Sequence, residues 1–200
     1  MPVIGLPDIA KAIAARRAPT RPLVVAIDGP SGSGKSTLAR RLAAQFPAAT
    51  VVEIDDFNSW SDPTGIAWWA RFDEQVLTPA LEGRPLRYQV RDWAHDEFGT
   101  SLAGWKSVPA ADVVIIEGVT SARLAARPRL AYSIWVEAPI ATRLDRGVAR
   151  DGDSHRDLWQ AWMRNEQEFF DDDKTRSNVD LAIDGAPDVR HDPATEVVAL

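Results

Sequence analysis

Short runs of apolar residues alternate along this chain with longer stretches in which apolar residues recur at helical spacing. Apolar runs without polar alternation are typical of parallel strands that are buried on both faces of a sheet. They predict strands at residues 23–27, 50–54, 113–116, 130–136 and 179–183. Amphipathic stripes predict helices at residues 6–17, 36–42, 65–77, 121–126 and 158–170. A further helix begins at Pro139, and its Leu144 and Val148 are expected to face inward. This alternation of strands and helices indicates an α/β fold.

Two segments depart from this pattern. Leu86, Tyr88 and Val90 alternate with polar side chains, which is typical of a strand with one exposed face. The polar residues 92–95 follow, and we expect a hairpin or flap here. At the end of the chain, residues 191–200 are expected either to add an edge segment or to stay loose.

Composition and charge limit the classes of protein that fit. The 200 residues are 45% hydrophobic and no linker-like tract divides them, so we expect a single domain over residues 1–200. The net charge of −6 argues against nucleic acid or an anionic membrane as the main partner. Cysteine is absent, which excludes disulfides, thiolate metal sites and cysteine nucleophiles. Because no signal-like or membrane-spanning run is found, we expect a cytoplasmic protein; a homo-oligomer stays open.

A phosphate-binding pattern lies between the first of these strands and the helix that follows it. Gly29, Gly34, Lys35 and Ser36 fit G-x-x-x-x-G-K-[ST], in which glycines let main-chain N–H groups surround a phosphate. Lys35 would neutralise the outer phosphates and the Ser36 hydroxyl would bind Mg²⁺. A flexible Gly-Ser linker is the alternative, but it would not sit between a buried strand and a helix. We therefore expect ATP phosphates on a loop made of Gly29, Ser31, Gly32, Ser33, Gly34, Lys35, Ser36 and Thr37.

Carboxylates follow two of the predicted strands. Asp55 and Asp56 come after residues 50–54, and Glu117 comes after residues 113–116. Ligands of open α/β sheets lie beyond the carboxyl ends of the strands, so these acids should face the phosphate loop. Asp55 is the candidate base for a hydroxyl that attacks the γ-phosphate, and Asp56 and Glu117 are candidate Mg²⁺ residues. The alternative is that each acid merely caps the next turn.

Arginines recur on the helix that begins at Pro139. Arg143, Arg146 and Arg150 are spaced three and four residues apart and share one face. A mobile lid over residues 143–157 would lay them on the phosphates, with Arg146 binding ATP and Arg150 assisting catalysis. A solvated surface is the alternative for these arginines.

Across the site, the flap would cover an acceptor pocket in which Tyr88, Trp93 and His95 stack on or hydrogen-bond a base. For His95, the alternative is that it lies in a solvated loop and contacts no ligand.

In this order, the motifs resemble the uridine kinase branch of the P-loop kinases and its uridine-kinase-like ATP-binding proteins, over about residues 24–184. The resemblance rests on IDGPSGSGKSTLA, DDF at 55–57, the segment 88–93, EG at 117–118, the R-x-x-R-x-x-x-R-D that ends at Asp151, and TRSNVDLAIDG. It implies a P-loop fold with a five-stranded parallel sheet flanked by helices, and ATP-dependent phosphorylation of a small-molecule hydroxyl. By the same resemblance, Asp55 is the general base, Lys35 and Ser36 contact phosphate and magnesium, and Arg146 and Arg150 belong to the lid.

The departures from the family lie in the expected acceptor region, residues 58–107. Asn58 stands where the family often has Tyr, and Arg91 replaces the Tyr of a Y-D-W signature. The ribose-binding Asp of the family has Asp62 and Asp73 as candidates here. The substrate-binding residues expected are Asp62, Tyr88, Arg91, Asp92, Trp93 and His95.

These features favour an ATP- and Mg²⁺-dependent kinase of a small-molecule acceptor, with a nucleoside such as uridine or cytidine first. A kinase of another metabolite, such as a sugar or vitamin precursor, is the second hypothesis. The third is a nucleotide-dependent switch without an acceptor; the missing N-K-x-D disfavours a GTPase.

Overall fold

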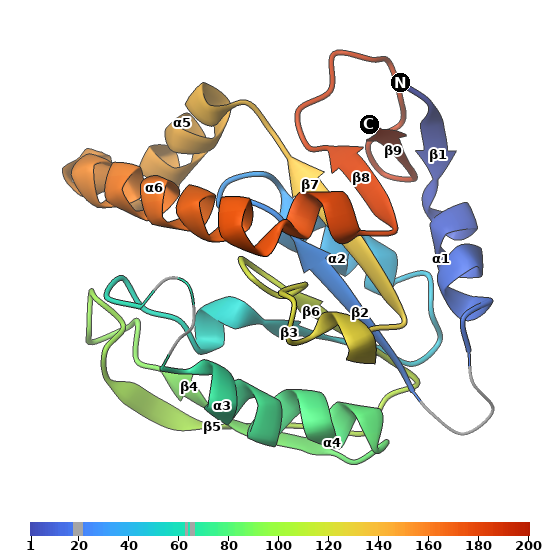
Figure 1. Ribbon diagram of the computed structural model, residues 1–200, viewed down its shortest axis with the longest axis horizontal. Helices are drawn as coiled ribbons and strands as arrows, with labels where there is room; N and C mark the ends of the chain where they lie inside the picture. The colour runs from blue at the N-terminus through green and yellow to red at the C-terminus, as the bar shows by residue number, and fades with distance from the viewer. Residues whose placement is uncertain (18–21, 63, 65–66) are drawn as a thin grey trace.

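A mostly parallel sheet crosses the computed structural model, which describes residues 1–17, 22–62, 64 and 67–200 (Figure 1). Its strand order is β1-β9-β8-β7-β2-β6-β3 in the described part of the chain. The bounds are Val3–Gly5 (β1), Leu23–Asp28 (β2), Ala49–Glu53 (β3), Val113–Glu117 (β6), Tyr132–Glu137 (β7), Leu181–Asp184 (β8) and Glu196–Ala199 (β9). The strands β8, β7, β2, β6 and β3 run parallel. They confirm the expected α/β fold and its five-stranded parallel core.

Two antiparallel strands extend this core beyond β8. β9 pairs with β8, and β1 pairs with β9 at the outer edge. The segment 191–200 therefore does add a strand, but an inner one. β1 was not predicted, because three residues are too few to show a hydrophobic period. This pairing brings the two ends of the chain together.

Helices cover both faces of the sheet. α1 (Leu6–Ala14) and α2 (Lys35–Ala43) pack against one face. The other face carries a continuous helical stretch made of α3 (Trp69–Phe72), a π-helical turn η2 (Asp73–Leu77) and α4 (Thr78–Leu81), together with α6 (Arg156–Asp173) (Figure 1). Along β2, Val25 and Ile27 join the first core while Val24 and Ala26 join the second. Burial on both faces explains why this strand is apolar throughout.

Four local expectations need correction. β3 is an edge strand and only half-buried, whereas a buried strand was expected. Residues 121–126 form turns that lead into the 3₁₀ helix η3 (Arg127–Arg129), so no α-helix forms there. The helix expected at 65–77 begins at Trp69; residues 65 and 66 lie outside the described residues. On α5 (Ile140–Asp151) the buried residues are Arg143 and Gly147 rather than Leu144 and Val148, because α5 packs on the phosphate loop and α6.

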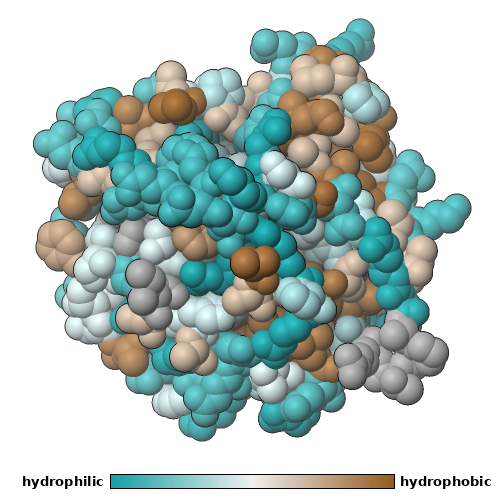
Figure 2. Space-filling model, viewed as in Figure 1, coloured by the Kyte–Doolittle hydropathy of each residue, from teal (hydrophilic) through white to brown (hydrophobic). Residues whose placement is uncertain are grey.

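The expected hairpin is present as a separate two-stranded sheet. β4 (Leu86–Arg91) pairs antiparallel with β5 (Leu102–Val108), and β5 is mostly exposed. Shorter 3₁₀ turns are η1 (Ile54–Asp56), η4 (Asp153–His155) and η5 (Thr175–Asn178). None of the helices in the described part of the chain combines the length and apolar character that crossing a bilayer requires. Figure 2 shows mostly hydrophilic residues along α6, which fits its largely exposed outer face.

Candidate active site

A cavity of about 610 Å³ opens where β2, β3 and β6 end. Its floor is the loop between β2 and α2 together with the first turn of α2. One wall comes from the tips of β3 and β6, and the opposite wall from α5, η4 and α6. The segments that follow β3 and β4 close the remaining side. The position beyond the carboxyl ends of parallel strands is the one at which open α/β sheets bind ligands.

The loop has the shape of an anion cradle. Gly29, Gly32 and Gly34 have φ of +135°, +77° and +108°, values that side chains rarely allow. A Cβ at Gly29 would lie 2.1 Å from the Val136 carbonyl oxygen, and one at Gly32 would lie 2.6 Å from that of Arg143. Glycine is therefore required at both positions. The first N–H groups of α2 have no intrahelical partner, so the cradle fits nucleotide phosphates.

The expected ATP-binding residues divide into a cavity surface and its support. Gly32, Gly34, Lys35, Ser36 and Thr37 line the cavity. Lys35 is buried, and its Nζ donates to the Pro30 carbonyl oxygen at 3.0 Å.

Ser31 also reaches the cavity, but its groups are engaged, since its N–H donates to Glu166 and its Oγ accepts from Trp162 Nε1. Ser33 is fully buried, and Gly29 packs on β7. Ser33 and Gly29 therefore do not line the cavity, whereas Ser31 lines it with its N–H and hydroxyl already engaged.

Glu117 and Asp55 face this cradle from neighbouring strand tips. Glu117 ends β6 and pairs with Glu53, the last residue of β3; Asp55 follows two residues later. Both carboxylates line the cavity, as does Ser36, whose side chain acts to lower the pKa of Glu117. Burial raises the pKa of Glu117 to about 7; the Asp55 charge acts in the same direction, while Lys35 and Ser36 oppose it.

The side chains of Ser36 and Glu117 are suited to bind Mg²⁺. The described residues contain no group of three or more His, Cys, Asp or Glu that could hold a metal on its own. Mg²⁺ in phosphate-transferring sites is bound by one or two protein oxygens and completed by substrate phosphates and water. The two side chains beside the cradle match that mode of binding.

Asp56 does not share this position. The 3₁₀ turn η1 directs its carboxylate to the β4–β5 hairpin, where both oxygens lie 2.8 Å from Lys106 Nζ. Burial raises the pKa of Tyr88, and the Asp56 charge adds to this rise. Asp56 is absent from the residues that line the cavity, so the structure does not bring it together with Ser36 and Glu117.

Of the six expected substrate-binding residues, Trp93 lines the cavity. Its Nε1 donates to the Asp55 carbonyl oxygen at 2.8 Å and its ring lies against Gly99. Tyr88 is buried and stacks on Phe57 with ring centroids 5.4 Å apart.

The other four residues support the surrounding segments. Arg91 donates to the carbonyl oxygens of Phe57 and Thr100. Asp62 accepts the Ala67 N–H, and Asp92 pairs with the exposed His95 at 2.9 Å. The flap thus shapes the cavity through backbone contacts, and Tyr88, Arg91, Asp62, Asp92 and His95 do not line it.

Several residues that line the cavity were not predicted. They include Asn58, Trp60, Glu97, Asp151, His155, Trp159 and Trp162. The Trp60 ring stands edge-on to Trp159 and Trp162, with centroids 6.0 and 5.2 Å apart. Trp159 and Trp162 of α6 are buried, yet both also reach the cavity. The sequence signal that could have placed them at the cavity is that their helix directly follows the helix that carries Arg146 and Arg150.

Two of the three lid arginines reach the cavity. Arg146 donates to the carbonyl oxygens of Gly32 and Gly185 at 3.0 and 3.1 Å. Arg150 forms a two-point contact with Asp151 at 2.8 and 3.0 Å. Arg143 is buried against Glu166 instead, so it is not a lid residue that could close on phosphates. His155 Nε2 lies 2.8 Å from Glu97 and links the η4 turn to the flap.

Asp28, at the end of β2, ties the start of the phosphate loop to the loop that follows β6. It is fully buried and accepts the N–H groups of Gly29, Thr120 and Ala122 at 2.7, 2.9 and 2.7 Å. Burial raises its pKa to about 6 against the effect of these hydrogen bonds and of Lys35. Its role was not predicted, because the position of an acidic residue at a strand end does not show whether its side chain is buried.

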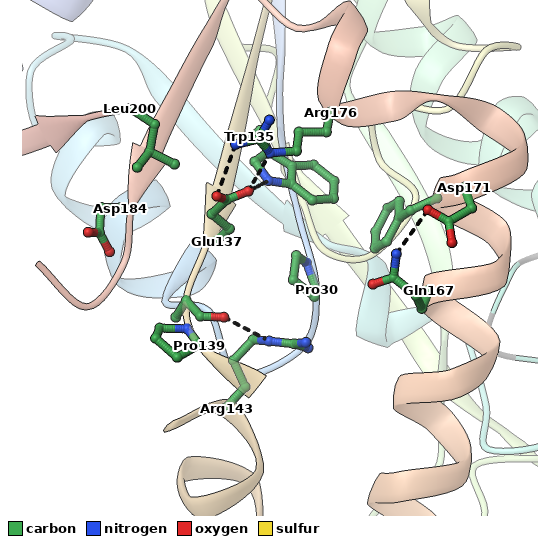
Figure 3. A pocket seen from close by; sticks show the side chains of 12 residues that line it. Pro30, Trp135, Glu137, Pro139, Arg143, Gln167, Asp171, Arg176, Asp184 and Leu200 are labelled. Carbon is green, nitrogen blue, oxygen red and sulfur yellow. Dashed lines mark hydrogen bonds and ion pairs between the residues drawn. The ribbon is translucent and has the colours of Figure 1, made fainter. Parts of the chain in front are cut away.

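A second hollow of about 460 Å³ lies between β7, β8 and α6 (Figure 3). Several of its polar groups are paired with one another: Glu137 accepts from Arg176 and from Trp135 Nε1, and Gln167 donates to Asp171. It lacks the phosphate cradle and the Asp55–Glu117 pair, so we place the active site in the larger cavity.

Residues 25–172 match the family model described as AAA domain. The chain belongs to this family. Among curated relatives, a cytidylate kinase of Ignicoccus hospitalis is 25% identical over 146 residues, 72% of this chain and 74% of that protein. A uridine kinase of Streptococcus equi subsp. zooepidemicus is 26% identical over 148 residues, 66% of this chain and 69% of that protein. The inorganic pyrophosphatase TTM2 of Arabidopsis thaliana is 28% identical over 137 residues, which cover 64% of this chain but 20% of that protein.

Solved structures confirm the fold. A possible uridine kinase from Bacillus stearothermophilus aligns with a TM-score of 0.65 at 20% identity, over 88% of this chain and 96% of that chain. D-glycerate 3-kinase from Cryptococcus neoformans aligns with a TM-score of 0.64 at 13% identity, over 96% of this chain and 98% of that chain. This AAA-domain chain therefore has a P-loop kinase fold and is similar in sequence to uridine and cytidylate kinases.

Proposed function

We propose that this chain is an ATP-dependent kinase that transfers the γ-phosphate of ATP to a hydroxyl of a small molecule, with a nucleoside as acceptor. The observation that carries the proposal is the convergence of Asp55 and Glu117 on the cavity whose floor is the phosphate loop. A binding protein without an acceptor has no need of a second carboxylate beside the metal residue.

Each group has a distinct task in this proposal. Lys35 and the main-chain N–H groups of the loop hold the ATP phosphates. Ser36 and Glu117 would hold Mg²⁺, which would supply positive charge to offset the negative charge that develops during transfer. Asp55 accepts the proton of the acceptor hydroxyl, and Asn58 Nδ2 orients it by donating to its Oδ1 at 3.0 Å. Arg146 and Arg150 stabilise negative charge on the transferred group.

The walls of the acceptor side support an uncharged acceptor with a flat ring. Trp60, Trp93, Trp159 and Trp162 supply aromatic surface. Among the described cations that line the cavity, Lys35 and Arg146 contact the phosphate loop and Arg150 is paired with Asp151. No arginine or lysine is left there for a phosphate on the acceptor itself. We therefore favour a nucleoside over a nucleotide such as cytidylate.

The test is a transfer assay with ATP, Mg²⁺ and a panel of acceptors. The panel contains uridine, cytidine, cytidylate, fructose and D-glycerate, and phosphorylated products are identified by mass spectrometry. We expect phosphorylation of a nucleoside and none of cytidylate. A phosphorylated sugar or acid alone would contradict the acceptor class. ATP binding without transfer to any alcohol, together with a nucleotide-dependent partner, would replace the kinase by a switch.

A further inference from the structure

A buried ion pair joins α5 to α6 behind the phosphate loop. Arg143 Nη1 of α5 lies 2.8 Å from Glu166 Oε1 of α6, and the two side chains are only 6% and 1% exposed. Withdrawing two charges from water is so unfavourable that such a pair contributes little net stability. Its retention in the interior therefore calls for a role other than stability.

Both partners also contact the loop itself. Glu166 Oε2 accepts the Ser31 N–H at 2.9 Å, and Arg143 Nη1 approaches the Ser31 carbonyl oxygen at 3.4 Å. Arg143 Nε donates to the Ala138 carbonyl oxygen at 3.1 Å, beside Pro30 (Figure 3). Trp162 Nε1 donates to Ser31 Oγ at 2.8 Å. The N–H, carbonyl and hydroxyl of Ser31 are thus all held from the α5–α6 side.

The backbone of α5 continues the same contact. A Cβ at Gly32 would lie 2.6 Å from the carbonyl oxygen of Arg143 and 3.0 Å from its Cα. One turn further along α5, Arg146 Nη1 donates to the Gly32 carbonyl oxygen. The outer half of the loop, residues 30–32, is therefore built directly against the α5–α6 unit.

We propose that Arg143 and Glu166 are positioning residues for phosphate binding. The pair holds residues 30–32 in the conformation that presents the loop N–H groups, and it sets Arg146 at a fixed distance from them. The inference deepens the proposed function and rests on it in taking ATP as the ligand. A loop ordered before ATP arrives avoids the entropy that ordering would otherwise remove on binding.

The decisive variant is the double substitution Arg143→Met/Glu166→Leu. Apolar replacement of a buried pair is often neutral or stabilising, while the Ser31 N–H and the Ala138 carbonyl oxygen each lose a partner, so its thermal unfolding midpoint should stay close to that of the wild type. Ser31 loses its charged partners, and the dissociation constant of a non-hydrolysable ATP analogue should rise about tenfold or more, the effect of freeing about one residue. In a transfer assay, KM for ATP should rise while kcat at saturating ATP stays close to the wild type.

Asp173→Asn is the matched control. Asp173 pairs with Arg127 at the other end of α6 and does not contact the loop. This variant should lower the unfolding midpoint and leave the affinity for the analogue unchanged. If the double variant fails to fold, Glu166→Gln decides. Ser31 and Arg143 donate to different oxygens of Glu166, and in glutamine one of these atoms becomes an NH₂ donor, so one contact is lost and binding should weaken by at least about threefold.

If the double variant folds and binds the ATP analogue with wild-type affinity, the proposal is overturned. If the double variant does not fold, wild-type affinity in Glu166→Gln overturns it. Equal weakening in Asp173→Asn would also overturn it, because affinity would then follow stability. Nucleotide binding is measured here without an acceptor, so the result holds even if no kinase activity is found. Conversely, a confirmed kinase whose variants bind ATP normally would refute this inference alone.

Discussion

Glu117 offers a prediction in which stability and activity move in opposite directions. Replacing it with Gln should stabilise the fold at alkaline pH and weaken phosphate transfer. The residue ends β6 with 5% of its surface exposed, and burial raises the pKa of its carboxyl from the ordinary 4.5 to about 7. The neighbouring Asp55 charge adds to this effect.

The sign of the pH dependence follows from that rise. A carboxyl with a raised pKa in the folded state favours folding while it is protonated, and the advantage is lost as pH increases from about 4.5 through about 7. The shift corresponds to about 3 kcal/mol in the free energy of unfolding. Glutamine resembles the protonated form at every pH. The variant should therefore match the wild type near pH 4.5 and exceed its unfolding free energy by up to about 3 kcal/mol at pH 8.

Urea unfolding followed by circular dichroism at pH 5 and pH 8 measures this difference. Glu53→Gln is a suitable control, because Glu53 pairs in register with Glu117 but is exposed on the edge strand. Its effect should stay within about 0.5 kcal/mol at both pH values. In the same Glu117→Gln protein, transfer should fall about 10- to 100-fold through weakened metal binding. A stability difference that is equal at pH 5 and pH 8 would refute the argument.

Two further predictions concern the two ends of the cavity. Lys35→Ala should weaken binding of a non-hydrolysable ATP analogue by about tenfold or more, because a charge-assisted contact to phosphate is lost. Calorimetric titration measures the affinity, and an unchanged value would exclude Lys35 from phosphate binding. Trp93→Ala should raise KM for the acceptor and leave KM for ATP unchanged, because the Trp93 ring is part of the wall on the acceptor side. If only KM for ATP changes, the acceptor binds elsewhere.

The parallel core and the phosphate loop could be predicted because each depends on a local pattern. Continuous apolar runs such as residues 113–116 indicate strands buried on both faces, and the glycine spacing indicates the cradle. β1 and β9 could not be predicted in the same way, since three or four residues show no period and their pairing depends on distant partners.

The acceptor side depends on contacts that sequence spacing does not encode. Asp55 and Asp56 are adjacent and chemically identical, and Lys106, far along the chain, is what holds Asp56 away from the cavity. Arg143 lies on the same helix as Arg146, yet Glu166 buries it. Trp162 has the helical spacing and the burial of a core residue, and yet it lines the cavity. Each assignment required the partner to be located in space.

The most direct test of the central claim compares two neighbouring carboxylates in one assay. Turnover of the acceptor with ATP and Mg²⁺ is measured for Asp55→Asn and for Asp56→Asn, with affinity for an ATP analogue measured alongside. We predict that Asp55→Asn lowers turnover on the order of a hundredfold or more while analogue affinity is kept, and that Asp56→Asn stays close to the wild type. Undiminished turnover in Asp55→Asn, or an equal loss in both variants, would contradict the account.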